Sequence, residues 1–408
     1  MRVLIYGVNF WPELTSTGKY TGELAAWLEH AGHEVTVVTA PPYYPAWRIQ
    51  SDYSGWSYRR EQIGGFRVWR CPIWVPRKPQ GLTRILHLLS FAISSAPVVI
   101  AHVLWRPKVV FVVAPTFLCA PTGWLAARLA RGRAWLHVQD FELDVAKGLK
   151  LIGNGILAGL ADRVERFWFR RFDKVSTISD RMMGRLATKG VDAKRRVLFP
   201  NWVDVEHIRP LEGSSPMRAE LGIADDAVVA LYAGNMGEKQ GLEILIDAAK
   251  RLQQKSKIVF VLAGGGAARE RLERLSADMP NIRWLPIQPA ERLNDLLNLA
   301  DIHLLPQRAD AADLVMPSKL TGMLASGRPV VATAAKGTQV QAVVEHRGKV
   351  VPPGDAVALA ARISELAGDV DLRRQLGQCA RQFAVERLGR DSILGAFERE
   401  LNLVAGES

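Results

Sequence analysis

The first side chain suited to chemistry is Lys319, which lies in residues 313–330, DLVMPSKLTGMLASGRPV. Proline at 317 and glycine at 327 are typical of a helix that starts at the first and stops at the second. Lys319 would lie in the first turn of that helix, where the backbone already carries partial positive charge. Such a cation and the unpaired amides beside it could together hold a strongly anionic group, such as a phosphate. The alternative is a lysine that is merely solvated at the surface.

Glycine-bearing turns form a second group of candidates. They lie at residues 7–20, 233–243 and 263–272, each between a predicted strand and a predicted helix. Glycine lets a backbone approach a phosphate closely, so these turns could bind anions, although each alone is equally consistent with an ordinary strand-to-helix turn. None matches the dinucleotide or P-loop patterns. The candidate glycines are Gly18, Gly234, Gly264, Gly265 and Gly266.

Polar residues of the first half could contact a sugar. The segment HVQDFELD ends a predicted strand, and Asp140 lies just past it, where ligands of parallel sheets bind. His137 is still within the strand, so a buried core histidine is the strong alternative to a contact with the acceptor. Glu13 could be an acceptor contact or a base, or equally an exposed loop acid. Tyr43 and Tyr44 could stack on a sugar or a lipid, or simply pack within a turn.

Composition narrows the class of protein. The chain has 408 residues, 48% of them hydrophobic, which predicts a folded protein of about two domains. Its three cysteines are scattered without metal-ligand spacing, and there is no DxD between the strands of the first domain and no His/Cys cluster. We therefore expect neither a metal site nor a disulfide framework.

The positive charge is concentrated in the first half. Residues 1–210 contain 29 Lys and Arg against 16 Asp and Glu, whereas residues 211–408 contain 24 against 25. An anionic partner is expected, and nucleic acid is the weakest choice because no nucleic-acid-binding motif accompanies the charge. The apolar segment 82–105 and the Arg- and aromatic-rich segment 155–172 favour peripheral contact with an anionic membrane, although a buried domain helix with a solvated basic face explains the second segment equally well. We predict a cytoplasmic protein on the inner face of that membrane.

Alternating apolar and amphipathic segments predict the fold class. Val- and Ile-rich strands separated by helix-length segments are typical of parallel sheets that are covered on both faces. The expected architecture is α/β, with two doubly wound Rossmann-like domains at 1–205 and 206–385 and a polar linker at 203–216. The Trp-, Tyr- and Pro-rich stretch 40–60 is long for a connection and is a candidate binding loop. The predicted strands are 2–7, 34–40, 66–71, 108–114, 133–138, 174–179, 227–234, 257–264, 281–286, 301–306 and 328–333.

Taken together, these motifs resemble the family 4 retaining glycosyltransferases of the GT-B fold. The similarity extends over nearly the whole chain, and its closest part resembles the branch of colanic-acid fucosyltransferases. The segments that carry it are PEL…TGKYTGEL, APPYYPAW, VWRCPIWVP, HVQDFELD, FPNWVDVEHIRP, YAGNMGEKQGLE, ADIHLLP and PSKLTGMLASGRPVVAT.

The resemblance implies a donor site in the second half, with departures from the family pattern. A family glutamate that contacts the ribose aligns with Gly322, and the acid eight residues before it aligns with Leu314, near Asp310 and Asp313. The usual Arg and Lys of the diphosphate loop are Asn235 and Gln240. Other groups must then offset the diphosphate charge. The candidates are Lys319, Lys239 and Arg308, with the backbone at Pro317, Ser318, Lys319 and Leu320 and at 264–267.

The implied reaction is the metal-independent transfer of a sugar, with retention, from a nucleotide donor to a lipid-linked saccharide in exopolysaccharide biosynthesis. GDP-fucose is suggested only by the branch. Lys319, Asp140 and Glu13 are the expected catalytic residues; no bound cofactor and no enzyme nucleophile is expected, and the segment 386–408 should cross back to the first domain. Three alternatives stay open: a non-catalytic partner in polysaccharide assembly, a sugar-nucleotide epimerase, and a nicotinamide-dependent oxidoreductase.

Overall fold

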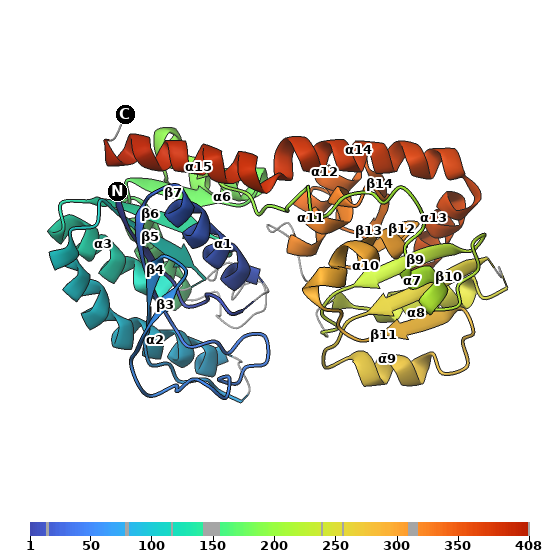
Figure 1. Cartoon of the computed structure of the whole chain (residues 1–408), viewed down its shortest axis with the longest axis horizontal. Coiled ribbons are helices and arrows are strands. Elements are labelled where there is room, and N and C mark those ends of the chain that lie inside the picture. Colours follow the sequence, from blue (N-terminus) through green and yellow to red (C-terminus); the bar gives the residue numbers. More distant parts are fainter. Residues whose placement is uncertain are drawn as a thin grey trace. The chain divides into compact units, whose positions relative to one another are not determined.

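The computed structural model describes residues 1–13, 16–77, 81–115, 117–141, 156–237, 240–254, 257–308 and 317–406. These residues form two compact units (Figure 1). Unit 1 comprises residues 1–200 and 394–408, and unit 2 comprises residues 201–393. Each unit is built on its own sheet.

The sheet of unit 1 is parallel except at one edge. Its strand order is β3-β4-β2-β1-β5-β6-β7-β8, and β3 alone runs antiparallel to its neighbour, β4. The strands are β1 (Arg2–Tyr6), β2 (Glu34–Thr39), β3 (Arg59–Ile63), β4 (Phe66–Arg70), β5 (Val109–Ala114), β6 (Arg133–Val138), β7 (Lys174–Thr177) and β8 (Arg196–Leu198). The helical elements are α1 (Ser16–His30), α2 (Gly81–Ala101), η1 (His102–Trp105), η2 (Phe117–Cys119), α3 (Ala120–Leu129), α5 (Ile156–Phe169), α6 (Asp180–Thr188), η3 (Ala193–Arg195) and, from the end of the chain, α15 (Arg390–Ala405).

The central strands of unit 1 consist of residues that suit burial on both faces. β5 is VVFVVA, and all six of its residues are buried. The last helix, α15, runs along unit 1 (Figure 1). It completes this core, because the ring of Phe397 stacks on Phe199 at 4.2 Å and contacts Trp135 at 4.9 Å. Residues about 200 positions apart in the sequence therefore share one hydrophobic core.

The sheet of unit 2 is wholly parallel, with the order β11-β10-β9-β12-β13-β14. This is the doubly wound order, in which the direction of winding reverses between the first and fourth strands of the sheet. The strands are β9 (Val228–Ala233), β10 (Ile258–Ala263), β11 (Ile282–Leu285), β12 (Ile302–Leu305), β13 (Val330–Thr333) and β14 (Gly348–Val351). The helical elements are α7 (Met217–Glu220), α8 (Glu243–Arg251), α9 (Arg269–Leu275), η5 (Ala290–Arg292), α10 (Leu293–Leu299), α11 (Ser318–Ala325), α12 (Gln339–Val344), α13 (Ala356–Gly368) and α14 (Val370–Leu388).

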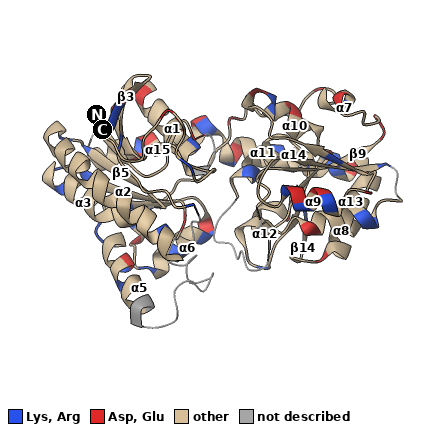
Figure 2. Cartoon of the chain, turned by 90° about the horizontal axis from the view of Figure 1, so that it is seen from below, with Lys and Arg blue, Asp and Glu red and all other residues tan. Residues whose placement is uncertain are grey.

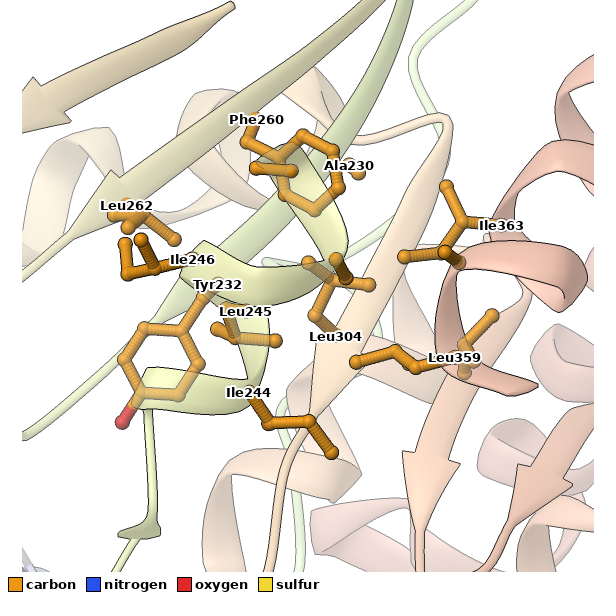
Figure 3. Close-up of a cluster of buried hydrophobic side chains, with 14 of the residues drawn as sticks. Ala230, Tyr232, Ile244, Leu245, Ile246, Phe260, Leu262, Leu304, Leu359 and Ile363 are labelled. Atoms are coloured by element: carbon orange, nitrogen blue, oxygen red, sulfur yellow. The ribbon is translucent and has the colours of Figure 1, made fainter. Parts of the chain in front are cut away.

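A cluster of buried side chains between the sheet of unit 2 and helices α8 and α13 fixes these strands (Figure 3). Tyr232, the penultimate residue of β9, belongs to it together with Leu245 and Phe260. The fold thus holds the carboxyl end of β9 rigidly.

The prediction that residues 203–216 form a linker was wrong. Val203 and Ile208 are buried in the core of unit 2. The Arg381 guanidinium donates hydrogen bonds to the carbonyl oxygens of Val205 and Ile208 at 2.8 Å each. The segment is polar in composition, but the burial of Val203 and Ile208 is enough to attach it to unit 2.

Candidate functional site

The switch point of the unit 2 sheet lies between β9 and β12, which are neighbours although three strands apart in number. Gly234 directly follows β9, and Lys319 lies on α11, the first helix described after β12. Ligands of open parallel sheets bind beyond the carboxyl ends of the strands at such a point. The fold therefore brings two of the predicted donor residues to the expected place.

Two glycine turns are joined at this edge of the sheet. The Gly234 amide donates to the Ala263 carbonyl at 3.0 Å, and the Met236 amide donates to the Gly265 carbonyl at 2.8 Å. Gly234, Gly264 and Gly266 have φ values of +146°, +141° and +146°, which side chains other than glycine rarely adopt. A Cβ on Gly264 would lie 2.0 Å from the Gly234 oxygen, so the two turns approach as closely as backbone allows.

Lys319 lies directly against these turns. Its ammonium is 4.2 Å from the centroid of the Tyr232 ring, and its Cδ would be 3.5 Å from a Cβ placed on Gly234. The Tyr232 hydroxyl donates to the Asn235 carbonyl at 2.6 Å, which orients the ring beneath the cation. The side chain keeps part of its surface in contact with water, but its crowded position removes enough solvent to lower the pKa of Lys319 to about 7.

The first turn of α11 supplies fewer amides than expected. Proline at 317 has no N–H group, and the Leu320 amide already donates to the Pro317 carbonyl at 2.9 Å. The expected four-residue anion site is therefore corrected to the amides of Ser318 and Lys319, which have no helical carbonyl partner in an α-helix.

Gly322, which the resemblance aligns with the family glutamate, lies on α11. A Cβ on Gly322 would lie 3.2 Å from Cδ1 of Leu297, so the neighbouring helix α10 occupies part of the space around this position. A glutamate here would require Leu297 to move. The ribose contact expected from the family has no replacement on this turn of α11.

The remaining donor candidates are only partly described. Lys239 and Asp313 lie outside the described residues, as do Asp310 and Leu314. Asn235 is exposed, and the amide oxygen of Gln240 is buried with no hydrogen-bond partner within the described ranges. Arg308 packs across Gly241, with its Cγ 2.7 Å from a Cβ placed there.

In unit 1, Glu13 is neither exposed nor free. It is 3% exposed, and Oε1 accepts hydrogen bonds from the amides of Tyr43 and Tyr44 at 2.9 and 2.8 Å. Asn9 donates to the second oxygen at 2.9 Å. Burial raises the pKa of Glu13, and these hydrogen bonds oppose that shift. The carboxylate ties the loop after β1 to the loop after β2, and these contacts give no support to a catalytic base.

Two further candidates are part of the same packing. Gly18 lies in α1, where a Cβ would be 2.8 Å from the Cβ of Glu13, so its lack of a side chain makes room for Glu13. Tyr43 is buried against His87, with ring centroids 4.8 Å apart. Tyr44 is partly exposed and of the two tyrosines it alone has surface to offer a ligand.

His137 is a buried core histidine, the alternative to a contact with the acceptor. It is 3% exposed, with Nδ1 2.9 Å from Ser176 Oγ and Nε2 2.9 Å from Gln139 Nε2. Desolvation lowers the pKa of His137 to about 3, so the ring is neutral. The prediction that it contacts an acceptor is therefore corrected: it is a core residue. Asp140, two residues past β6, is partly exposed at the carboxyl edge of the sheet.

Comparison with known proteins identifies the family. Residues 16–202 match the glycosyl transferase 4-like domain, and residues 214–383 match the glycosyl transferases group 1 family. The chain is 40% identical over 412 aligned residues to a protein of Escherichia coli (strain K12) named as a colanic acid biosynthesis glycosyl transferase, WcaI. The alignment covers 98% of this chain and 100% of that protein. The chain belongs to the group 1 glycosyltransferases.

Solved structures agree on the fold of this glycosyltransferase. Sucrose-phosphate synthase from Thermosynechococcus elongatus has a TM-score of 0.76 at 20% identity, with 100% of both chains covered. HepE from Anabaena, solved in complex with UDP-glucose, has a TM-score of 0.68 at 18% identity, with 98% of this chain and 99% of that chain covered. The predicted GT-B fold of two Rossmann-like parallel sheets is confirmed.

The sequence did not indicate that Tyr232 belongs to the candidate site. It is part of a continuous apolar strand, ALYAG, and a tyrosine there is an ordinary core residue. Only the position of Lys319 over its ring gives it a role.

Proposed function

We propose that this glycosyltransferase moves a sugar from a nucleotide donor to a lipid-linked saccharide, with retention, in exopolysaccharide biosynthesis. The name of its 40% identical relative supports the pathway class, colanic acid biosynthesis. The UDP-glucose bound to HepE supports a nucleotide sugar as donor, without fixing the base. GDP-fucose is the donor that the resemblance of the sequence favours.

The observation that carries this proposal is the position of Lys319 beside two glycine turns at the switch point. We assign the diphosphate to the Lys319 ammonium, the Ser318 and Lys319 amides and the turns at Gly234 and Gly264. A cation held near backbone N–H groups binds phosphate more strongly than either would alone. This cation replaces the arginine and lysine that the family carries at Asn235 and Gln240.

The proposed chemistry is a substitution on one face of the sugar. The bond between the anomeric carbon and the diphosphate oxygen breaks, and the acceptor hydroxyl forms its bond to that carbon from the same side. Its proton passes to an oxygen of the departing phosphate, so no enzyme nucleophile is needed. Lys319 stabilises the negative charge that grows on the leaving group, which is why no metal ion is required. Asp140 is proposed to contact a sugar, and unit 1 to bind the acceptor.

Nucleotide binding gives the direct test. We expect GDP to raise the melting temperature of the purified protein, because a ligand that binds only the folded state stabilises it according to its occupancy. The measurement is differential scanning fluorimetry with GDP, UDP, ADP and NAD at equal concentrations.

The outcomes of that titration, together with one assay of the donor sugar, separate the candidate functions. Stabilisation by UDP or ADP instead of GDP would still support a glycosyltransferase but would exclude GDP-fucose as its donor. NAD alone would favour the oxidoreductase, and no shift with any nucleotide would favour the non-catalytic partner. Isomerisation of the donor sugar without an acceptor would identify an epimerase.

We also propose that unit 1 lies on an anionic membrane at the cytoplasmic face. Among the described residues, one segment, 81–105, is long and apolar enough to cross a membrane by length and composition alone, and 22% of its 18-residue window is buried. Its inner face packs on the unit through His87, Phe91 and Ser95. Its outer face forms the α2 stripe, defined as the exposed residues Leu82, Ile85, Leu86, Leu89 and Ile93.

The α2 stripe has helical spacing, so its side chains form one continuous apolar surface. Leu82 is 69% exposed and Ile93 is 66% exposed, which is unusual for large aliphatic residues in water. Helix α5 presents a second surface of this kind, with Leu160, Val164 and Phe167 exposed among Arg163 and Arg166. Figure 2 shows the basic residues on the elements of unit 1, α5 among them.

Replacing Leu82, Leu86 and Ile93 by serine should weaken vesicle binding about tenfold or more, because the apolar area that inserts into the interface is reduced. The measurement is cosedimentation with phosphatidylglycerol vesicles. The control carries serine at Leu275 and Val357, which are exposed aliphatic residues of unit 2. Equal binding of the stripe variant and the control would refute the role of α2.

A further inference from the structure

Unit 1 contains a large cavity whose lining includes none of the residues assigned a role so far. Its volume is about 890 Å³, and its walls are residues 47–56, which follow β2, and residues 73–77, which follow β4. β2 and β4 are parallel neighbours in the sheet, so both walls lie at the carboxyl edge, where ligands bind. This volume is within the range of sites for small organic ligands.

The two walls are held together by the backbone and by α2. The Ile73 amide donates to the Gly55 carbonyl at 2.9 Å, and the Trp74 amide donates to Ser90 Oγ on α2 at 3.0 Å. His87 of α2 lies 2.6 Å from the Trp74 carbonyl through Nδ1. The cavity is therefore a formed feature of the unit and not a gap between loose loops.

Trp47 shows that the first wall has a fixed conformation. Its φ is +52°, an unfavourable value for a residue with a bulky side chain. Its ring packs against Tyr43 at 5.6 Å and against His87 at 5.3 Å, and these contacts hold it in place. Backbone strain of this kind persists where the surrounding structure fixes it and is concentrated at binding sites.

The lining has a distinctive composition: four large aromatic rings and two arginines. They are Trp47, Tyr53, Trp56, Trp74, Arg48 and Arg77. Trp56 is 82% exposed and Trp74 is 37% exposed, so large ring surfaces are left uncovered beside the cavity. Within the described ranges, neither Arg48 nor Arg77 pairs with a carboxylate, whereas nearby Arg70 pairs with Glu61 at 2.5 Å.

The aromatic rings and the arginines of this lining each favour a different chemical group in the ligand. The flat faces of aromatic rings suit the C–H faces of a sugar ring, which are apolar although its rim is polar. The planar guanidinium binds phosphate oxygens in pairs and remains charged at every relevant pH. A ligand that satisfies both halves carries a sugar joined to a phosphate or pyrophosphate.

We propose that this cavity binds the saccharide and the pyrophosphate of a polyprenyl-linked acceptor. The inference rests on the proposed function, since it names the site and the chemical class of the acceptor. The rings of Trp56 and Trp74 stack on the sugar, and Arg48 and Arg77 bind the pyrophosphate. The wall at 73–77 leads toward α2, whose apolar stripe would lie on the bilayer that holds the lipid tail.

The test uses the full chain and a synthetic ligand, glucosyl pyrophosphoryl farnesol, in isothermal titration calorimetry. Titrations are made with and without a saturating concentration of the nucleoside diphosphate that the protein binds, so that the donor site is filled. Farnesyl pyrophosphate, which lacks the sugar, and methyl glucoside, which lacks the pyrophosphate, should each bind at least about tenfold more weakly.

Two single substitutions separate the halves of the lining. Trp56→Ala should weaken binding of the complete ligand about tenfold, and an 82% exposed side chain can be removed without loss of folding. Arg77→Gln should weaken it by a similar factor and reduce its dependence on salt. Lys108→Gln is the matched control, since Lys108 is exposed and directly precedes β5, at the opposite edge of the same sheet.

The outcomes separate this inference from the proposed function. Unchanged affinity in both cavity variants, with normal binding of the nucleoside diphosphate, would overturn the cavity assignment and leave the transferase intact. Failure of the wild-type chain to bind any nucleoside diphosphate would instead overturn the proposed function. In a transfer assay, the cavity variants should raise the KM for the acceptor while the KM for the donor stays constant.

Discussion

Lys319→Met should lower kcat for sugar transfer by about 10²–10³, the effect of removing one preorganised group that stabilises developing negative charge. Methionine is unbranched and shorter than lysine by one heavy atom, so the change removes the ammonium and keeps most of the packing on Tyr232. The measurement is the initial rate of transfer at saturating donor. The melting temperature should not fall, because a cation whose pKa is lowered to about 7 is destabilising to the folded state when it is protonated.

Donor affinity should also depend on pH through the same lysine. In the free protein the pKa of Lys319 is about 7, and a bound diphosphate, which favours the protonated form, must raise it. Binding above pH 7 is then coupled to proton uptake, so affinity should fall by up to about tenfold per pH unit between pH 7 and 9. The free protein, by contrast, gains stability from this group as pH rises above 7, since the unfolded chain then binds more protons.

Lys319→Arg is the control for this pH dependence. The guanidinium stays protonated throughout the range, so the variant should bind the donor with a flat pH profile. A wild-type profile that is equally flat, or a methionine variant with normal kcat, would show that Lys319 does not hold the diphosphate.

Gly264→Ala should abolish measurable donor binding and lower the melting temperature by several degrees. The new Cβ would lie 2.0 Å from the Gly234 carbonyl oxygen, and the φ of +141° is unfavourable for alanine. Both glycine turns would have to separate, and this would displace the backbone beneath Lys319. The measurements are calorimetric titration with the nucleotide and thermal unfolding.

Gly265→Ala is the matched control in the same turn. Its Cβ would meet only the side chain of Ile287, with Cδ1 at 3.3 Å and Cγ1 at 3.6 Å, which is flexible at its end. Unfolding should be nearly unchanged, and nucleotide affinity should fall by less than about tenfold. Equal losses in the two variants would contradict the proposed role of the close approach between Gly264 and Gly234.

The strands that sequence predicted well are those buried on both faces. β5 and β9 consist almost entirely of apolar residues, so their burial is visible in the sequence. β3, RREQI, was missed because it lies at the edge of the sheet and none of its five residues is fully buried. A strand whose stability comes from pairing with β4 leaves no hydrophobic pattern to detect.

The placement of the residues proposed for the donor site was more predictable than that of the residues proposed for the acceptor side. Glycines after strands and a lysine at a helix start are local signals, and the fold brings them together because their strands are neighbours. The burial of Glu13 could not be predicted, because nothing in the sequence shows that the loops after β1 and β2 meet at its carboxylate. The cavity requires the same knowledge: residues 40–60 attracted notice, but their partner at 73–77 becomes apparent only when β2 and β4 are known to pair.

The contribution of α15 to unit 1 constrains the order in which the protein can be completed during synthesis. Phe397 fills the core between Trp135 and Phe199, yet it is synthesised only after the whole of unit 2. Unit 2 lies between, and all of its residues, 201–393, are available first. The half of the protein that is translated first is therefore the half that completes its core last, and until then its hydrophobic surface is exposed, which favours aggregation.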